Sequence, residues 1–415
     1  MISPLHLFFG LLIFAVCLPG PAAAERQDSM ISHHYVLTDD FQRFEAELEL
    51  PAGTAIELVT DPGFIPEALP GFGAAYGRVR AVGVAETGQF WLEHEDEADD
   101  QILQRQVAAG EWIGIRNRFR AGLLRPSAPA VAQVSMDASN QPRLSLVAAD
   151  ADASLAFMFY AGPVELQALR AIDPQLSSML FAALWNWLRA LCFGMLWLLT
   201  IIENVVGNLG VSIIVLSLAV KILMSPLTRI ADRLQESVNR TQALLQPHLD
   251  AIKRDYKGEE AHDRTLAVYK EHQVHPLYTL KSLVGFLIQI PIFIAAFDVL
   301  GEHVALDQAS FLWIEDLAKP DRWLPLPVVL PFFGGHLNLL PILMTGVTVL
   351  TSWMQTDPSL TPDLLRRQQM RLFLMAGAFF LLFYTFPAGM VLYWTTNNVL
   401  HLMKIKLLPT IRQAI

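Results

Sequence analysis

The chain has 415 residues, of which 53% are hydrophobic and 17% are charged, and its mean hydropathy is +0.37. Ordinary soluble domains carry about 25% charged residues, so this composition argues against a wholly soluble enzyme, and the high hydrophobicity argues against disorder over most of the chain. The net charge of −10 argues against a nucleic-acid partner, because basic surfaces supply most of the affinity for nucleic acid.

The charge is distributed unevenly along the chain. Residues 25–180 contain 23 acidic and 11 basic residues, a net charge of −12. Residues 181–415 contain 17 acidic and 19 basic residues, a net charge of +2. The sequence therefore divides into an acidic part that faces water and an apolar, slightly basic part that is the membrane candidate.

Residues 1–24 have the layout of a signal peptide. They contain no acidic residue, lysine or arginine, and an apolar run at residues 7–18 is followed by an alanine triplet that predicts cleavage after Ala24. The alternative is an uncleaved signal anchor, and either form exports the residues downstream of it. The only cysteines are Cys17 and Cys192, so we expect no disulfide framework and no cysteine metal site.

Residues 25–176 are predicted to form a periplasmic antiparallel β-sandwich. Apolar side chains alternate with three glutamates over Phe44–Leu50, and this period of two marks a strand with one buried face. Proline and glycine turns separate further predicted strands at residues 79–84, 90–92 and 112–115. No metal site is predicted, because the acidic run at residues 93–100 lacks the spacing of a Ca²⁺-binding loop and His33 with His34 has no third ligand.

Residues 177–206 are predicted to include an interfacial amphipathic helix. Arg189 and Glu203 enclose only 13 residues, which is short for a membrane span. The tryptophans at positions 185, 187 and 197 favour a helix that lies at the outer membrane interface. A span here would also invert the charge pattern of all later segments.

Residues 207–407 are predicted to contain five membrane spans. The last charge-free segment, residues 372–403, runs for 32 residues. As one helix it would be about 48 Å long, too long for a single pass through about 30 Å of hydrocarbon. Pro387 and Gly389 divide it into two spans. The other three spans are placed at residues 207–227, 282–300 and 338–354.

The lysines and arginines between these spans predict the orientation. Segments rich in basic residues alternate with a segment poor in them, so residues 229–275 and the short tail at residues 408–415 are predicted to be cytoplasmic in a bacterial inner (plasma) membrane. Apolar residues at helical spacing within residues 229–275 predict a hairpin of two antiparallel helices. This hairpin serves either as a connector or as a docking site for a ribosome or targeting factor.

The predicted spans lack groups for covalent chemistry. No acidic residue lies in the core of a span, and no serine nucleophile motif or metalloprotease motif is present. We therefore predict no catalytic residue, no cofactor and no enzyme activity. Lys221 is the 15th residue of the 21-residue first span. A cation in hydrocarbon costs about 2.5–3.5 kcal/mol, so Lys221 either extends to the cytoplasmic surface or faces water within the bundle.

Other polar residues occur in the same span as Lys221 and in later spans. Ser217 lies one helical turn before it, and Gln289, Thr348 and Asn398 interrupt later spans. Each residue taken singly is more often a hydrogen bond between helices than a substrate contact. Together they predict a hydrated groove with one positive charge, which attracts a polar or acidic polypeptide segment.

A series of short motifs resembles the YidC-type membrane protein insertases of the YidC/Oxa/Alb superfamily. Each motif is weak by itself, but their order and spacing over residues 180–407 are specific. Residues 112–114 (WIG) and 160–163 (YAGP) further resemble the end of the periplasmic domain of the bacterial members. The core motifs are VKILMSPLT at residues 220–228, LLQP at 244–247, HPL at 275–277, LIQIPIF at 287–293, LPIL at 340–343 and FPAGMVLYW at 386–394.

The resemblance implies a five-helix core with a groove that is open to the cytoplasm and to lipid. By motif position Lys221 matches the groove arginine of the family, Ser217 a hydroxyl residue one turn earlier, and Trp394 an aromatic residue on the last span. The implied activity is insertion of nascent membrane proteins into the lipid bilayer, alone or with the Sec translocon. The driving force comes from burial of the substrate helix in lipid, so no ATP is required.

The chain departs from the family pattern in three places, one of which is Tyr278 to Lys281, where the usual small-residue and cysteine pattern is missing. Lysine at position 221 keeps the charge but loses the bidentate geometry of arginine. The exported domain is shorter than is usual, which leaves its partners open and also allows a specialised paralogue. Two other functions remain as alternatives: a small-solute or lipid transporter that uses the same polar face, or an envelope sensor whose sandwich binds a ligand.

Overall fold

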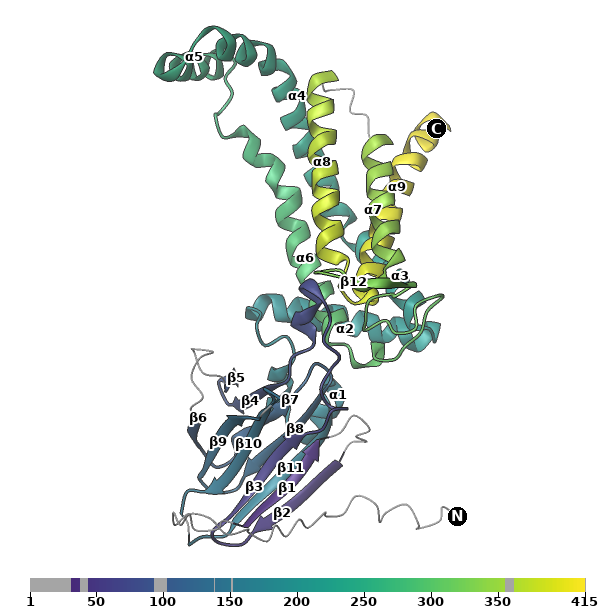
Figure 1. Ribbon diagram of the computed structural model, residues 1–415. Coiled ribbons are helices and arrows are strands. Elements are labelled where there is room, and N and C mark those ends of the chain that lie inside the picture. The colour runs from purple at the N-terminus through teal and green to yellow at the C-terminus, as the bar shows by residue number, and fades with distance from the viewer. Residues whose placement is uncertain are drawn as a thin grey trace.

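The computed structural model describes residues 31–37, 44–92, 103–137, 139–150, 152–354 and 362–414. The predicted signal peptide at residues 1–24 and the acidic run at residues 93–100 lie outside these ranges. Figure 1 shows a β-rich part at one end of the molecule and a helical part at the other, with helix α2 (Asn186–Val206) between them.

The β-rich part consists of two sheets. One sheet has the order β1-β3-β10-β9-β6, with β1 (Ile31–Leu37), β3 (Thr54–Thr60), β6 (Leu103–Val107), β9 (Ala130–Met136) and β10 (Pro142–Ala148). The other has the order β2-β11-β8-β7-β4-β5, with β2 (Phe44–Leu50), β4 (Arg80–Ala85), β5 (Gly88–Trp91), β7 (Trp112–Arg116), β8 (Arg120–Pro126) and β11 (Leu155–Pro163). The four strands predicted from the sequence fall on β2, β4, β5 and β7.

The sheets enclose a common hydrophobic core, to which Ile56 and Leu146 contribute from one sheet and Ile113 and Phe159 from the other. One pair of strands departs from the antiparallel prediction, because β1 and β3 pair in parallel. The intervening strand β2 lies in the opposite sheet, so the chain returns beside β1 in the same direction. Strand β2 shows the predicted alternation, because its three glutamates are exposed and Leu50 is buried; only Phe44, at the start of this edge strand, departs from it and remains 46% exposed.

The middle of the second sheet is buried on both faces. Every residue of β7 is buried, so the strand lacks the alternation of a half-exposed sheet. The face away from the sandwich core carries Trp112 and Leu123, which pack against helices α1 (Leu166–Ile172) and η2 (Pro174–Met179). The Trp112 Nε1–H donates a hydrogen bond to Asp173 Oδ2 at 3.0 Å. The sandwich is therefore joined to the helical part by a continuous core.

Gly114 in β7 leaves no room for a side chain. A Cβ at this position would lie 2.0 Å from the carbonyl oxygen of Gly122 and 2.8 Å from Cα of Leu123 in β8. Because the backbone of a buried strand cannot move aside, we expect Gly114→Ala to lower the free energy of unfolding by about 1–3 kcal/mol. Thermal unfolding in detergent micelles measures this effect. Gly194→Ala in α2, where no atom lies within 4 Å of the added Cβ, is the control, and an equal shift in both variants would contradict the prediction.

The helical part comes after α2 in the chain. Its helices are α3 (Leu209–Leu223), α4 (Ser225–Asp255), α5 (Gly258–Glu271), α6 (Leu283–Glu302), α7 (Leu339–Met354), α8 (Pro362–Phe383) and α9 (Ala388–Ala414). Shorter elements are η1 (Gly71–Tyr76), which precedes β4 in the chain and packs against the helical part, η3 (Tyr278–Ser282), η4 (Val304–Leu306), β12 (Leu324–Leu330) and β13 (Gly334–Leu337). The structure confirms the break predicted at Pro387, since α8 ends at Phe383 and α9 begins at Ala388.

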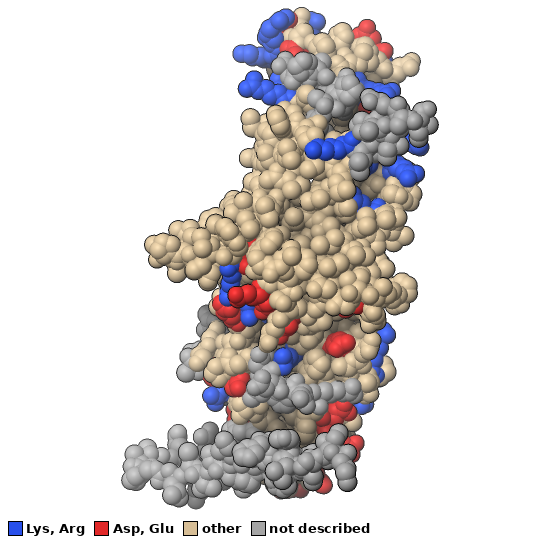
Figure 2. Space-filling model, turned by 90° about the vertical axis from the view of Figure 1, so that its right-hand side faces the viewer, with Lys and Arg blue, Asp and Glu red and all other residues tan. Residues whose placement is uncertain are grey.

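The number of membrane spans is not confirmed. Among the described helices, α2 and the stretch Tyr278–Glu302 are long and apolar enough to cross a membrane, and α3 with α4 makes a third candidate that is bent by 60°. Figure 2 shows a broad surface without charged residues between the sandwich and a basic end. Helix α2 has the length of a span, yet Figure 1 shows it running across the direction of α6, α7 and α8. Its interfacial position and the five-span count stay predictions.

Helices α4 and α5 form the hairpin expected within residues 229–275. Val238 and Leu245 of α4 are buried together with Tyr278, and Tyr269 of α5 packs against them. The hairpin starts earlier than predicted, because α4 begins at Ser225 and continues from the end of α3 after the bend at Met224. Proline in the first turn of α4 favours a new helix start at this point.

Candidate functional site

Helix α9 brings most of the predicted site residues together. It packs against α3 and α7 and also contacts α6. The helical period places Tyr393 and Asn397 on one face, and Trp394 and Asn398 about 100° further round. The surroundings of each predicted residue therefore depend on the helix that each of these faces meets.

The face of α9 that meets α3 carries two polar links. Ser217 is fully buried, and its Oγ donates a hydrogen bond to the Tyr393 carbonyl oxygen at 2.9 Å. Lys221 is half-buried, and its Nζ donates to the Asn397 carbonyl oxygen at 2.8 Å. The two links lie one turn apart on both helices, so Ser217 and Lys221 share one face of α3.

The positive charge of Lys221 has no acidic partner in the part of the chain that the structure describes. Its hydrogen-bond acceptor is a backbone carbonyl, which carries only a partial negative charge. The charged side chain that acts on it is another cation, Lys404, whose amine pairs with Asp232 of α4 at 2.8 Å. Lys221 is thus a half-buried cation whose described contacts do not neutralise its charge.

The face of α9 that meets α7 holds the pair of Thr348 and Asn398. Asn398 Nδ2 donates to Thr348 Oγ1 at 2.8 Å, and that hydroxyl donates to the Met344 carbonyl oxygen at 2.9 Å. Both side chains therefore take part in a hydrogen bond between helices, which is the commoner role of such residues in membrane helices.

Trp394 lies in an aromatic cluster that joins α9 to α6 and α8. Its ring centroid is 5.0 Å from that of Phe293, 5.4 Å from Phe379 and 5.6 Å from Phe383. Gln289, one turn before Phe293 on α6, is exposed. The six predicted residues thus do not form one continuous lining, because Trp394 packs in a core while Gln289 faces outward.

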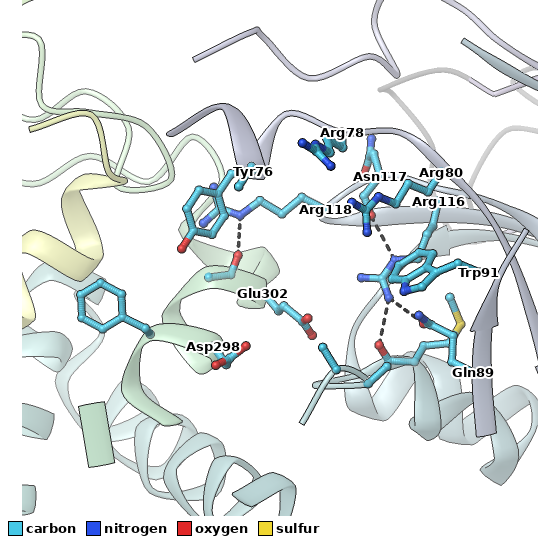
Figure 3. A pocket seen from close by; sticks show the side chains of 16 residues that line it. Tyr76, Arg78, Arg80, Gln89, Trp91, Arg116, Asn117, Arg118, Asp298 and Glu302 are labelled. Carbon is cyan, nitrogen blue, oxygen red and sulfur yellow. Dashed lines mark hydrogen bonds between the residues drawn. The ribbon is translucent and has the colours of Figure 1, made fainter. Parts of the chain in front are cut away.

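A second polar region, which was not predicted from the sequence, lies between the sandwich and the end of α6. It contains a cavity of about 260 Å³. Figure 3 shows Asp298 and Glu302 of α6 on one side of this cavity and arginines of the sandwich on the other. The buried Arg116 donates from Nη1 to the Met179 carbonyl oxygen at 2.9 Å and to Gln89 Oε1 at 3.1 Å.

Arg118 connects the sandwich to the end of α6. Its Nη1 donates to the Ala318 carbonyl oxygen at 2.8 Å, and its Nε donates to the Gly301 carbonyl oxygen. Burial lowers the pKa of Arg118 to about 10, so the guanidinium stays charged at neutral pH. Its charge faces the negative end of the α6 dipole, where carbonyl groups lack partners within the helix. The sequence signal for this junction is an alternation of arginines, at positions 116, 118 and 120, in an otherwise acidic domain.

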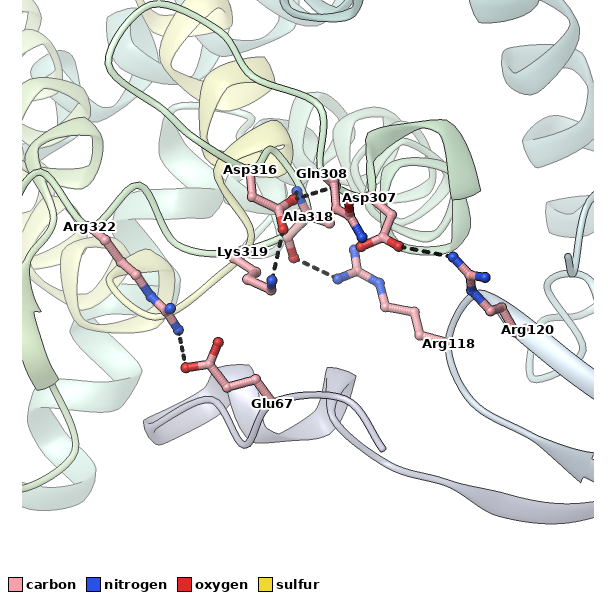
Figure 4. Close-up of polar contacts among 9 residues, drawn as sticks. All are labelled: Glu67, Arg118, Arg120, Asp307, Gln308, Asp316, Ala318, Lys319 and Arg322. Carbon is pink, nitrogen blue, oxygen red and sulfur yellow. Dashed lines mark hydrogen bonds and ion pairs between the residues drawn. The ribbon is translucent and has the colours of Figure 1, made fainter. Parts of the chain in front are cut away.

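Ion pairs surround this junction (Figure 4). Arg322 Nη2 lies 2.7 Å from Glu67 Oε1, and Arg120 Nη2 lies 3.8 Å from Asp307 Oδ2. The hydrogen bond from Arg322 lowers the pKa of Glu67 below its usual value. The pair therefore stabilises the fold at neutral pH, and its contribution is lost as the pH falls through the lowered pKa of Glu67. Because both groups are partly exposed, the contribution is small.

Comparisons with known proteins agree on one family. A family model described as "60Kd inner membrane protein" matches residues 201–412. Proteins named "Membrane protein insertase YidC" are 33% identical over 250 residues in Syntrophobacter fumaroxidans and 32% identical over 300 residues in Ralstonia nicotianae. These matches cover 60% and 70% of this chain but 42% and 49% of the relatives. The chain thus spans about half the length of the curated relatives that it matches.

Among solved structures, a crystal structure titled "Active YidC insertase crystal structure with the first transmembrane domain resolved" is 18% identical to the chain. The match covers 72% of this chain and 78% of that one, with a TM-score of 0.38.

Proposed function

The chain belongs to the 60Kd inner membrane protein family, and on this basis we propose that it is a membrane protein insertase and chaperone of the bacterial inner membrane. The observation that carries the proposal is Lys221, a half-buried cation whose hydrogen bond goes to a backbone carbonyl. The proposed substrate groove is built from Lys221, Ser217, Gln289, Thr348, Trp394 and Asn398.

The proposed mechanism has two steps and no covalent chemistry. First, a hydrophilic segment of a nascent membrane protein enters beside Lys221, whose charge attracts acidic groups and whose amine offers hydrogen-bond donors. Second, the apolar helix of the substrate moves from the protein surface into lipid. Burial of about 20 apolar residues supplies the free energy for this step.

The proposed orientation places the sandwich in the periplasm and the C-terminus in the cytoplasm. Figure 2 shows lysines and arginines gathered at the end of the molecule opposite the sandwich. Basic residues favour the cytoplasmic side of a membrane protein. The bent pair α3–α4 and the candidate span that contains α6, together with α7, α8 and α9, supply the proposed five-span core, and α2 is proposed to lie at the membrane interface.

The hairpin of α4 and α5 is the proposed contact site for a ribosome or targeting factor. Figure 1 shows it projecting beyond the ends of α7 and α8. Leu244 of α4 is 56% exposed and Leu266 of α5 is 41% exposed, so the hairpin offers apolar contact area on its surface. The proposed insertase releases its substrates into the bilayer alone or together with the Sec translocon.

Site-specific photo-crosslinking tests the proposal. A photoreactive amino acid at Gln289 is expected to form adducts with a ribosome-stalled single-span nascent chain, because this exposed residue is a proposed contact residue. Matched positions are Glu47 on the sandwich and Leu374 on α8, which is 78% exposed. Adducts at Gln289 that disappear in the Lys221→Ala background support the proposal. Equal adducts at Leu374 would instead indicate contact through lipid alone and would contradict it.

A further inference from the structure

The hairpin of β12 and β13, residues 324–337, is an apolar projection that the proposed function does not use. It contains no acidic residue, lysine or arginine. Polar contacts close its base, where Asp321 Oδ2 accepts hydrogen bonds from the backbone N–H groups of Leu339 and Leu340 at 2.8 and 2.9 Å. The Arg322 N–H donates to Asn338 Oδ1 at 3.1 Å. These bonds fix the position of the hairpin at the start of α7.

The turn of the hairpin is also held in place. The Phe332 ring packs against Phe72 of η1 with centroids 5.2 Å apart, and Phe333 packs against Tyr384 with centroids 5.0 Å apart. The Tyr384 hydroxyl donates to the His336 carbonyl oxygen at 3.1 Å. The hairpin is therefore an ordered element with contacts at both ends.

Between these contacts, β12 is exposed on both of its faces. Val328 is 63% exposed and its neighbour Val329 is 74% exposed, although successive residues of a strand point to opposite sides. Leu324 and Leu330 are nearly half exposed at the two ends of the strand. A protein surface that faces water seldom keeps such a contiguous apolar patch without a partner.

The backbone of β12 suits an apolar environment. Pro325 and Pro327 lie within the strand and Pro331 follows it, and none of them has an N–H group. An N–H group without a partner costs several kcal/mol in lipid, so prolines on an exposed strand edge reduce this cost. Edge strands that face water are usually protected by charged side chains instead, and β12 carries none.

The position of the hairpin matches the edge of a bilayer. Figure 1 shows β12 on the helical side of α2, across the ends of α7 and α8. Helix α2 carries the exposed Trp187 and Trp197, and Trp185 directly precedes it; tryptophan favours the membrane–water interface. Helix α7 begins two residues after β13 and exposes apolar Leu343 on its surface. The apolar surface of the hairpin therefore continues into that of the helices.

We propose that residues 324–337 form a membrane anchor that lies in the outer leaflet and contacts lipid acyl chains. Lipid is the occupant that fits, because the patch has no charged group with which to recognise a polypeptide and adjoins the apolar surface of the helices. The anchor fixes the ends of α7 and α8 and the η1 segment at one depth. The choice of the outer leaflet rests on the proposed function, in which the sandwich lies in the periplasm.

Fluorescence quenching in liposomes tests the anchor. Single cysteines replace Val329, Leu374 or Glu47 in the full chain with Cys17 and Cys192 changed to alanine, and each is labelled with an environment-sensitive dye. The lipids carry a nitroxide either near the headgroup or deep in the acyl chain, and iodide is added as a quencher in water. The label at Val329 is expected to lose more fluorescence to the shallow nitroxide than to the deep one, and little to iodide.

The two other positions calibrate the measurement. The label at Leu374, in the charge-free part of α8 that follows Arg371, is expected to respond to the nitroxides and not to iodide, and the label at Glu47 only to iodide. A Val329 label that iodide quenches as it does at Glu47 would overturn the proposal. A Val329 label protected from iodide and from both nitroxides would also overturn it, because a second copy or another protein then covers the hairpin. Crosslinking at Gln289 is measured separately, so failure of the anchor and failure of the insertase proposal are distinguishable.

Discussion

Replacing Lys221 with glutamate is expected to reduce insertion of a small single-span protein by at least about tenfold, the equivalent of about 1.4 kcal/mol of lost interaction. The lysine amine donates to the Asn397 carbonyl oxygen, whereas a carboxylate would place two acceptors face to face. The substitution also reverses the charge that an acidic substrate segment meets. Insertion in cells depleted of the native protein measures the effect.

Three further variants, two at Lys221 and one at Ser217, separate the effect of charge from the effect of packing. Lys221→Arg keeps the charge and is expected to insert substrate at nearly the normal level, while Lys221→Ala is expected to lie between arginine and glutamate. Ser217→Ala removes the neighbouring hydrogen bond to Tyr393 without changing charge, and we expect a smaller loss. Normal insertion by both the alanine and the glutamate variants of Lys221 would exclude the proposed role of the cation.

Replacing Arg118 with alanine is expected to loosen the junction between the sandwich and α6. The carbonyl groups of Gly301 and Ala318 lose their charged donor, and each buried acceptor without a partner costs about 1–3 kcal/mol. Because water from the adjoining cavity can replace part of the lost bonding, we expect the free energy of unfolding to fall by about 2 kcal/mol. Hydrogen exchange of the amides in residues 300–318 is expected to become faster.

A matched control for this substitution is Arg143→Ala on β10. Arg143 is exposed on the sandwich, so its removal changes the net charge equally without affecting the junction. Arg118→Lys retains a cation with a single donor group and is expected to show intermediate exchange. If exchange in residues 300–318 stays unchanged in Arg118→Ala, then those carbonyl bonds do not hold the two parts together.

Local patterns in the sequence were enough to predict much of the fold. The alternation at residues 44–50, the break at Pro387 and the hairpin within residues 229–275 each depend on a period or a punctuating residue, and the structure has a strand, a break and a hairpin at these places. The parallel pairing of β1 with β3 was not predictable in this way, because it depends on which sheet the intervening strand joins. The burial of both faces of β7 likewise depends on helices that come later in the chain.

The candidate site was predictable in its residue types but not in its arrangement. The cost of a charge among apolar residues singles out Lys221, and helical spacing predicts Ser217 on the same face. Periodicity within one span does not tell which neighbour a polar residue meets, so the pairing of Thr348 with Asn398 and the exposure of Gln289 required the packed helices. The alternation of Arg116, Arg118 and Arg120 is visible in the sequence, but it does not show that the partners of Arg118 are backbone carbonyls of a distant segment.

The hydrophobic core shared by the sandwich and the helices determines the order in which parts of the protein can finish folding during synthesis. Trp112 and Leu123 belong to the same buried cluster as Leu188 and Leu216, which leave the ribosome long after them. The second sheet can close on the first sheet, which consists of β1, β3, β6, β9 and β10, but its other face is not covered until α1, η2 and α2 have been made. The sandwich is therefore not a module that matures alone. The outer face of its second sheet is buried only when helices that come later in the chain have packed against it. The sandwich therefore completes its folding after those later residues have been made.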